Sequence, residues 1–363
     1  MDNMDYEKYL NERLNELNLS ELEGVLEYSG SSFEKFSVRD VMDSMLSGDA
    51  LFDSQVFIEN LKDLFLLEIK DSLILASEII TICIIMALLK SISSSFGEKA
   101  VSHIAIMVSG ALVIALCLVN FKSTYSLCQE TINIMAYTMQ LLLPLVIPFL
   151  ISLGGITSGS LLSPIIMGAI TIFNTLMQKL VLPALFFSSI FILINSLTDK
   201  NYVNKLALFL RGAATFATGL CVTIFSGLTV IQGFASNSAD GLLINTARYS
   251  INNFVPIVGG FAADSIDMVL SCIGILKNGI SIFGVILIIL LLLTPLIKLL
   301  AIAVIYKVTA IITEPIGLDN ISDCLNEMGN SVITMAVVLF LTALMFLIFI
   351  TVIISIGGVG LSQ

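Results

Sequence analysis

The chain has 363 residues, of which 57% are hydrophobic and 12% are charged, and its mean hydropathy is +1.00. Soluble domains carry about a quarter charged residues, so this composition excludes an ordinary soluble protein and indicates a membrane protein. The formal net charge of −11 and the lack of a Lys/Arg run also exclude nucleic acid as a partner, because phosphate binding needs clustered cations.

Residues 1–70 form a separate acidic segment. They contain 16 of the 28 acidic residues but only six of the 17 basic residues. Apolar residues recur about once per helical turn in DYEKYLNERLNELNLSELEGVLE, which is typical of an amphipathic helix. We therefore predict a helical extramembrane segment over 1–70. Its acids are interpreted as a solvated face, with a binding surface as the alternative.

From Ser72 onward, apolar runs of about 20 residues recur, and each is long enough to cross a hydrocarbon core of about 30 Å. We split the longest tract at Thr294-Pro295, because proline is disfavoured inside a helix. The predicted fold class is all-α, a polytopic helical membrane protein with about 8–10 transmembrane helices, some of them broken. The predicted helices are 72–90, 102–121, 132–153, 160–178, 181–198, 213–233, 265–291, 295–313 and 331–356.

Basic residues near helix ends predict the orientation, since Lys and Arg favour the cytoplasmic side. Lys90 and Lys99 flank one connection, and Lys200, Lys205 and Arg211 lie at another. Both connections fall on one side if the first six spans alternate. We therefore expect that side to be cytoplasmic, with the N-terminal segment and the C-terminus outside the cytoplasm.

Landmarks that recur about 112 residues apart predict a tandem internal repeat. Pro144 matches Pro256, Gly168 matches Gly279, and Pro183 matches Pro295; Gly212 also matches Gly329, at a slightly larger offset. The expected division is an acidic segment (1–70), a transmembrane hairpin (71–122), repeat unit A (123–235) and repeat unit B (236–358). In unit A, the predicted broken helix contains Pro144, Pro148, Gly154 and Gly155.

The stretch NNFVPIVGGFAADS in unit B contains the matching break. Proline lacks a backbone donor and paired glycines permit unusual dihedral angles, so a regular helix is not expected to continue through it. Irregular backbone within a membrane must be covered by protein or face a wet cavity. The candidate residues for a polar path or for subunit docking are Asp240, Arg248, Asn252, Asn253, Pro256, Gly259, Gly260, Asp264, Asp267 and Lys277. The alternative is that they are helix caps and surface charges.

Lys277, Lys298 and Glu78 lie inside apolar sequence. Each is expected to reach an interface or to find a partner of opposite charge, because a charge at mid-membrane is costly. The six cysteines are isolated and His103 is the only histidine. We therefore predict no metal, no cofactor and no catalytic residues, and we expect the protein not to be an enzyme.

A stretch of about 80 residues resembles a known family. The pieces IQG, DG, TAR, NFVPIVGG, D-S-x-D and LKN carry the likeness to the stage III sporulation protein AE family of endospore-forming bacteria, and weaker similarity extends from about Leu64 to Gly358. Members usually begin with a cleavable signal peptide, and this chain differs because it starts at MDNMDYEKYL.

The resemblance implies a multi-pass protein of the mother-cell membrane around the forespore. Its implied partners are the other stage III sporulation A membrane proteins, the lipid bilayer and, indirectly, stage II sporulation protein Q. The implied function is a permease-like or channel-forming subunit of a conduit that supports forespore development. A purely structural scaffold is the alternative. Small-solute cargo and a homo-oligomer stay open.

Overall fold

The computed structural model describes residues 20–25, 38, 41, 44, 54–96, 99–153, 156–196, 203–254, 259–316 and 318–355. Within these residues the protein is helical and contains no strand. This confirms the predicted all-α class. Most of the acidic N-terminal segment lies outside the described residues, although the short helix α2 (Ser20–Gly24) packs against α5.

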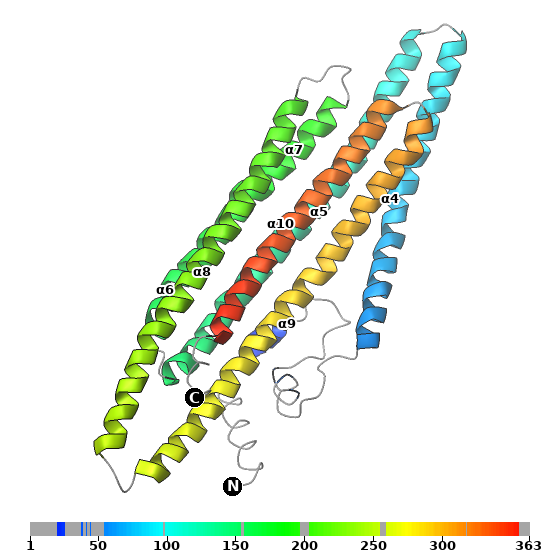
Figure 1. Ribbon diagram of the computed structural model, residues 1–363. Helices are drawn as coiled ribbons and strands as arrows, with labels where there is room; N and C mark the ends of the chain where they lie inside the picture. Colours follow the sequence, from blue (N-terminus) through cyan, green and yellow to red (C-terminus); the bar gives the residue numbers. More distant parts are fainter. Residues whose placement is uncertain are drawn as a thin grey trace.

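In this part of the chain, six long helical stretches run alternately up and down (Figure 1). Their bounds are Ser54–Phe96 for α4, Lys99–Ser152 for α5, Ile156–Leu176 for α6 together with Leu182–Asn195 for α7, Asn204–Phe254 for α8, Gly259–Thr313 for α9, and Asp319–Ser355 for α10. The helix α9 packs against α10, α5 and α4, whereas α8 packs against α7, α6 and α10. The fold is therefore an elongated antiparallel bundle.

The bundle has two ends, which we call upper and lower as they appear in Figure 1. At the upper end α4 is followed by α5, α7 by α8, and α9 by α10. At the lower end α5 is followed by α6, and α8 by α9. The helix ends next to Lys99 and Lys205 thus lie at the same end, as the charge pattern predicts.

Several pairs of predicted spans are in fact single helices. α5 runs without interruption from Lys99 to Ser152, so 102–121 and 132–153 are one helix. α9 likewise contains Pro295, and the predicted split at that residue is wrong. By length and composition, five stretches of the described chain suffice to cross a membrane, fewer than the eight to ten predicted: Met107–Ser152, Pro164–Asn195, Asn204–Gly233, Ile273–Thr313 and Asp319–Ser355.

Pro144 and Pro148 do not break their helix either. Both lie inside α5, on exposed positions of the bundle surface. A proline removes one backbone donor, and a long helix tolerates that loss when its other turns keep their hydrogen bonds. α5 ends at Ser152 and α6 begins at Ile156, while Gly154 and Gly155 lie outside the described residues.

A third proline does change the helix geometry. Between α6 and α7 the chain forms the π-helical turn η2 (Met177–Val181), in which the Leu182 N–H donates to the Met177 carbonyl. Pro183 follows and has no N–H to give to the carbonyl of Lys179, so the wider turn is the local adjustment. The helix axis continues, and α6, η2 and α7 act as one span.

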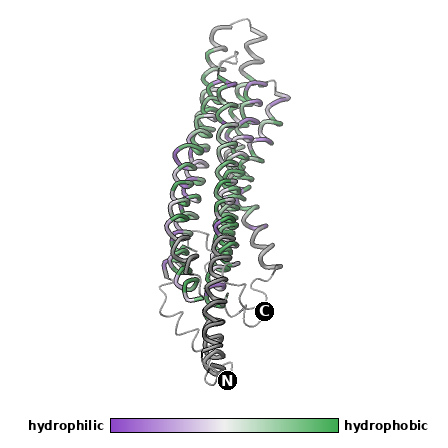
Figure 2. Tube along the Cα trace, turned by 60° about the vertical axis from the view of Figure 1, so that its left-hand side comes forward, coloured by the Kyte–Doolittle hydropathy of each residue, from purple (hydrophilic) through white to green (hydrophobic). Residues whose placement is uncertain are grey.

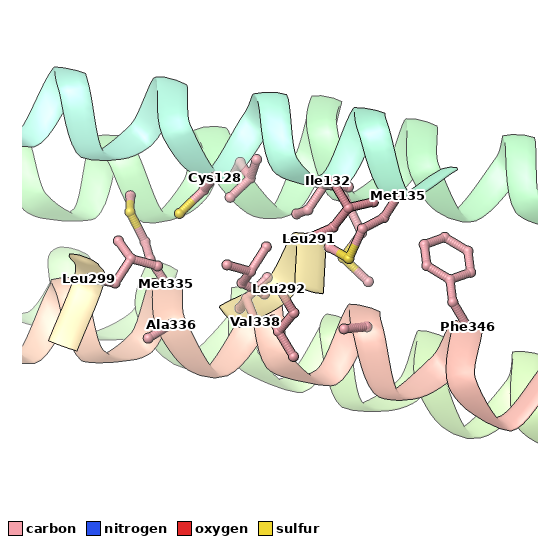
Figure 3. Packing of buried hydrophobic residues seen from close by; sticks show 14 of the residues in the cluster. Cys128, Ile132, Met135, Leu291, Leu292, Leu299, Met335, Ala336, Val338 and Phe346 are labelled. Carbon is pink, nitrogen blue, oxygen red and sulfur yellow. The ribbon is translucent and has the colours of Figure 1, made fainter. Parts of the chain in front are cut away.

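The core lies along the middle of the bundle, where α5, α9 and α10 meet. Figure 3 shows Cys128, Ile132 and Met135 facing apolar residues of the other two helices. Two buried glycines permit close approach. A Cβ added to Gly284 would lie 2.6 Å from Leu142 Cδ1, and one added to Gly329 would lie 3.3 Å from the Ala303 carbonyl oxygen. α9 is therefore held tightly between α5 and α10.

The helices are longer than a bilayer is thick. The span Ile273–Thr313 has 41 residues and Met107–Ser152 has 46, which correspond to about 60 and 70 Å at 1.5 Å per residue. A hydrocarbon core measures only about 30 Å. Figure 2 shows hydrophobic colour over most of this length, with hydrophilic colour in shorter stretches between.

Candidate functional site

The predicted polar residues fall where α8 and α9 extend beyond their apolar spans. α8 continues from Gly233 to Phe254, and α9 begins at Gly259, well before Ile273. We call residues 234–272 the polar hairpin. It forms the lower end of the α8–α9 pair (Figure 1).

α8 stays helical up to Phe254, two residues before Pro256, and α9 begins at Gly259. Nothing removes a backbone donor from α8 before Pro256, and the predicted break at that residue stays a prediction. Pro256 itself lies outside the described residues. The helical part of the hairpin contains Asp240, Arg248, Asn252, Asn253, Gly259, Gly260, Asp264 and Asp267, whose side chains are outside the description.

Lys277 is the candidate residue whose side chain is described, and it is almost fully buried, with 1% of its surface exposed. Its Nζ donates to the carbonyl oxygens of Ile354 at 3.0 Å and Ile353 at 3.4 Å. These carbonyls belong to the last turn of α10, where helix carbonyls lack intrahelical donors and the macrodipole is negative. Lys277 thus holds the end of α10 against α9.

A second motif from the family likeness contacts the same turn. Gly233 of the IQG piece lies against Val352, and a Cβ at this position would come within 2.6 Å of Val352 Cγ1. Gln232 Oε1 and Asn278 Oδ1 are buried and have no hydrogen-bond partner among the described residues. The IQG and LKN pieces, 44 residues apart in the sequence, therefore converge on the end of α10.

A larger polar cluster lies near the upper end, between α8 and α10. Arg211 Nη2 lies 2.9 Å from Glu327 Oε2 and donates to Ser331 Oγ at 3.1 Å. The two charged side chains are 15% and 33% exposed, respectively, so this ion pair is largely inside the bundle. Arg211 Nε is buried and has no hydrogen-bond partner among the described residues.

Lys307 of α9 extends this cluster to a third helix. Its Nζ donates to Asn330 Oδ1 at 2.8 Å and to Asn326 Oδ1 at 3.3 Å, and Asn330 Nδ2 donates to Glu327 Oε1 at 3.2 Å. We call Arg211, Lys307, Asn326, Glu327, Asn330 and Ser331 the upper polar network. It connects α8, α9 and α10 within their apolar spans.

A cavity of about 380 Å³ adjoins the upper polar network. Lys307 and Asn326 line it, together with the acidic residues Glu314, Asp319 and Asp323. Because Lys307 and Asn326 belong both to the network and to the cavity wall, polar groups continue from the cavity into the bundle.

Lys298 was expected either to reach an interface or to find a partner of opposite charge, and it has a carboxylate partner. Its Nζ lies 3.2 Å from Glu68 Oε2 and donates to Glu68 Oε1 at 3.3 Å. Glu78, which we considered as a lysine partner, has an exposed side chain on α4. The pair that forms joins α9 to α4.

Sequence reasoning missed the upper polar network. Arg211 was used only to predict orientation, and Lys307 and Glu327 were not singled out. Their common signal is that each is a charged residue inside or at the edge of a long apolar run. A single sequence does not show that these three residues meet, because Arg211 and Glu327 are 116 positions apart.

The fold and its buried polar contacts define a class of protein, namely a multi-pass α-helical membrane protein with ionisable groups between its helices. The chain belongs to the stage III sporulation protein AE family, whose model matches residues 36–357. It is similar to the stage III sporulation protein AE of Bacillus subtilis (strain 168), with 31% identity over 313 residues, 86% of this chain and 78% of the relative. No solved structure matches the chain.

Proposed function

We propose that the chain is a permease-like or channel-forming subunit of a conduit between the mother cell and the forespore. Family membership supports a role in sporulation. The upper polar network is the observation that carries the permease proposal. Ionisable residues inside a membrane bundle are costly to keep and commonly mark the path of an ion or solute.

The cavity suggests where a solute enters. It adjoins the network at the upper end, and its wall contains both a lysine and several acids. Such a lining suits small polar solutes that carry charges of both signs. In this proposal the solute contacts Lys307 and Asn326 first and then reaches the Arg211–Glu327 pair.

The tandem repeat is part of the same proposal. The α6–α7 stretch followed by α8, and α9 followed by α10, are two hairpins that run in the same direction. Arg211 precedes Gly212, and its partner Glu327 lies two residues before the matching Gly329. The upper polar network would thus lie where the two copies meet, as in transporters built from repeats. The proposed unit borders, near 122 and 235, lie within α5 and α8.

The orientation and partners are proposed from the charge pattern and the family. The upper end would face the mother-cell cytoplasm, and the N-terminal segment, the polar hairpin and the C-terminus would lie outside it. The polar hairpin would then dock the other stage III sporulation A membrane proteins and, through them, stage II sporulation protein Q. If docking were the protein's whole role, the chain would be a structural scaffold.

Substitution separates the two roles. In the complex purified with the full chain and reconstituted in vesicles, we expect Arg211→Gln to reduce small-solute passage at least about tenfold, the factor that corresponds to one lost charged contact with the solute. Subunit recovery should stay unchanged. Lys205→Gln, an exposed position on the same helix, is the matched control and should behave as wild type. The scaffold role would be supported by two results together. Arg211→Gln would pass solute normally, and the polar-hairpin variants Arg248→Ala and Asp264→Ala would fail to assemble with the other subunits.

A further inference from the structure

Two charged side chains lie on the outer surface of the bundle at the middle of its apolar spans. Glu130 is 23 residues after the start of the span Met107–Ser152, and Lys179 is 15 residues after the start of Pro164–Asn195. Both side chains are exposed. A bilayer centred on these spans would place both charges in hydrocarbon, where they are costly.

The two charges lie at nearly the same height on neighbouring helices. Asn174 Nδ2 of α6 donates to Asn133 Oδ1 of α5 at 3.3 Å, which fixes the relative height of the two helices. Glu130 is one turn above this contact on α5, and Lys179 is five residues above it on the antiparallel α6–η2 stretch. At 1.5 Å per residue their heights differ by only about 3 Å.

Moving the bilayer up or down along the helices takes the two charges out of the hydrocarbon only by leaving other apolar surface in water. These helices are about twice as long as a hydrocarbon core, so a bilayer that avoids Glu130 and Lys179 leaves one half of the apolar surface in water. Above the two charges, Val119 is 71% exposed and Phe187 is 53% exposed; below them, Ile172 is 60% exposed. In either position, this face needs a protein cover.

We propose that a second copy of the same chain covers the outer face of α5 and of the α6–η2 stretch, with Glu130 of each copy paired to Lys179 of the other. Copies inserted in the same direction are related by an axis along the membrane normal, which keeps each residue at its own height. Because the opposite charges share one height, a twofold arrangement brings both pairs together at once. The exposed Asn133 beside the pair adds an uncharged polar contact to the same surface.

This interface goes beyond the proposed function and does not depend on transport. Charge reversal tests it in the full-length chain, in detergent or lipid nanodiscs, by native mass spectrometry. Each single variant, Glu130→Lys or Lys179→Glu, places like charges opposite each other. We expect each to raise the dissociation constant of the dimer at least about tenfold. When the two single variants are co-expressed with different tags, the mixed dimer has both pairs restored and should recover. A pair within one chain would not be rescued by such mixing.

Glu78→Lys is the matched control, since it reverses an exposed acid on α4, away from the α5–α6 face. It should leave the dimer intact. Should a reversed variant fail to fold, differently tagged Glu130→Cys and Lys179→Cys chains, in a background without the native cysteines, provide a second measurement. A disulfide between the two tags supports the interface. The interface would be overturned if the wild-type chain were monomeric or if both single variants still formed dimers. Loss of the dimer in Glu78→Lys, or the absence of a crosslink between the tags, would overturn it as well.

Discussion

Among single residues, Lys277 shows most directly how this fold accommodates a charge inside the bundle. A buried ammonium group is stable only if polar groups replace its lost water. The last carbonyls of α10 serve this purpose, because they have no donors of their own and lie at the negative end of a helix dipole. The lysine and the helix end therefore satisfy each other.

We expect Lys277→Met to loosen the end of α10 and to lower the free energy of unfolding by about 1–3 kcal/mol, the usual cost of leaving buried polar groups unpaired. Lys205→Met, an exposed lysine on α8, should stay within about 0.5 kcal/mol of wild type. Denaturant unfolding in detergent measures both, and protease cleavage near Ser355 reports the local effect. Equal stability of Lys277→Met and wild type, with no new cleavage, would show that the contact is dispensable.

At the scale of whole helices, the decisive feature is that α5 continues through residues 122–131. Hydropathy alone favours two spans here, because Lys122, Gln129 and Glu130 form a polar interval of loop-like composition. In the structure their side chains lie on the outer part of one helix, and buried neighbours such as Cys128 and Ile132 keep the interval packed.

Two spin labels test this continuity. Val119 and Ile151 are both exposed and lie 32 residues apart on α5. In one helix the labels should be about 48 Å apart, whereas two antiparallel spans joined by a loop would bring them to about 30 Å. Pulsed electron paramagnetic resonance on Val119→Cys/Ile151→Cys, in a chain without its native cysteines, distinguishes these distances. The shorter distance would mean that α5 is two helices.

Local patterns predicted the helical class, the apolar stretches and the shared end of the basic residues, because these depend on composition and on periodicity along the chain. They did not predict helix continuity at Pro295 or Pro144, since tolerance of a proline depends on the packing around it. Nor did they predict that Tyr306 donates to Asn120 at 3.1 Å, a contact between residues 186 positions apart. For Lys298, its place in apolar sequence predicted either a partner or an interface position, but the choice of Glu68 required the structure.

For the molecule as a whole, the alternating helices place the polar hairpin and the start of α10 at opposite ends. We therefore expect a membrane-impermeant maleimide to label Asn320→Cys from the cytoplasmic side and Asn253→Cys only from the other side. The described native cysteines are buried and should contribute little background. Cytoplasmic labelling of Asn253→Cys would reverse the orientation of the bundle.

The most direct test of a permease or channel is passage itself. Vesicles containing the full chain and the membrane subunits purified with it are loaded with a small labelled amino acid, and release is followed over time. We expect release well above that of protein-free vesicles, and we expect Arg211→Gln to abolish most of the difference. Release no faster than from protein-free vesicles, by a complex whose subunits are all present, would contradict a solute path through this bundle.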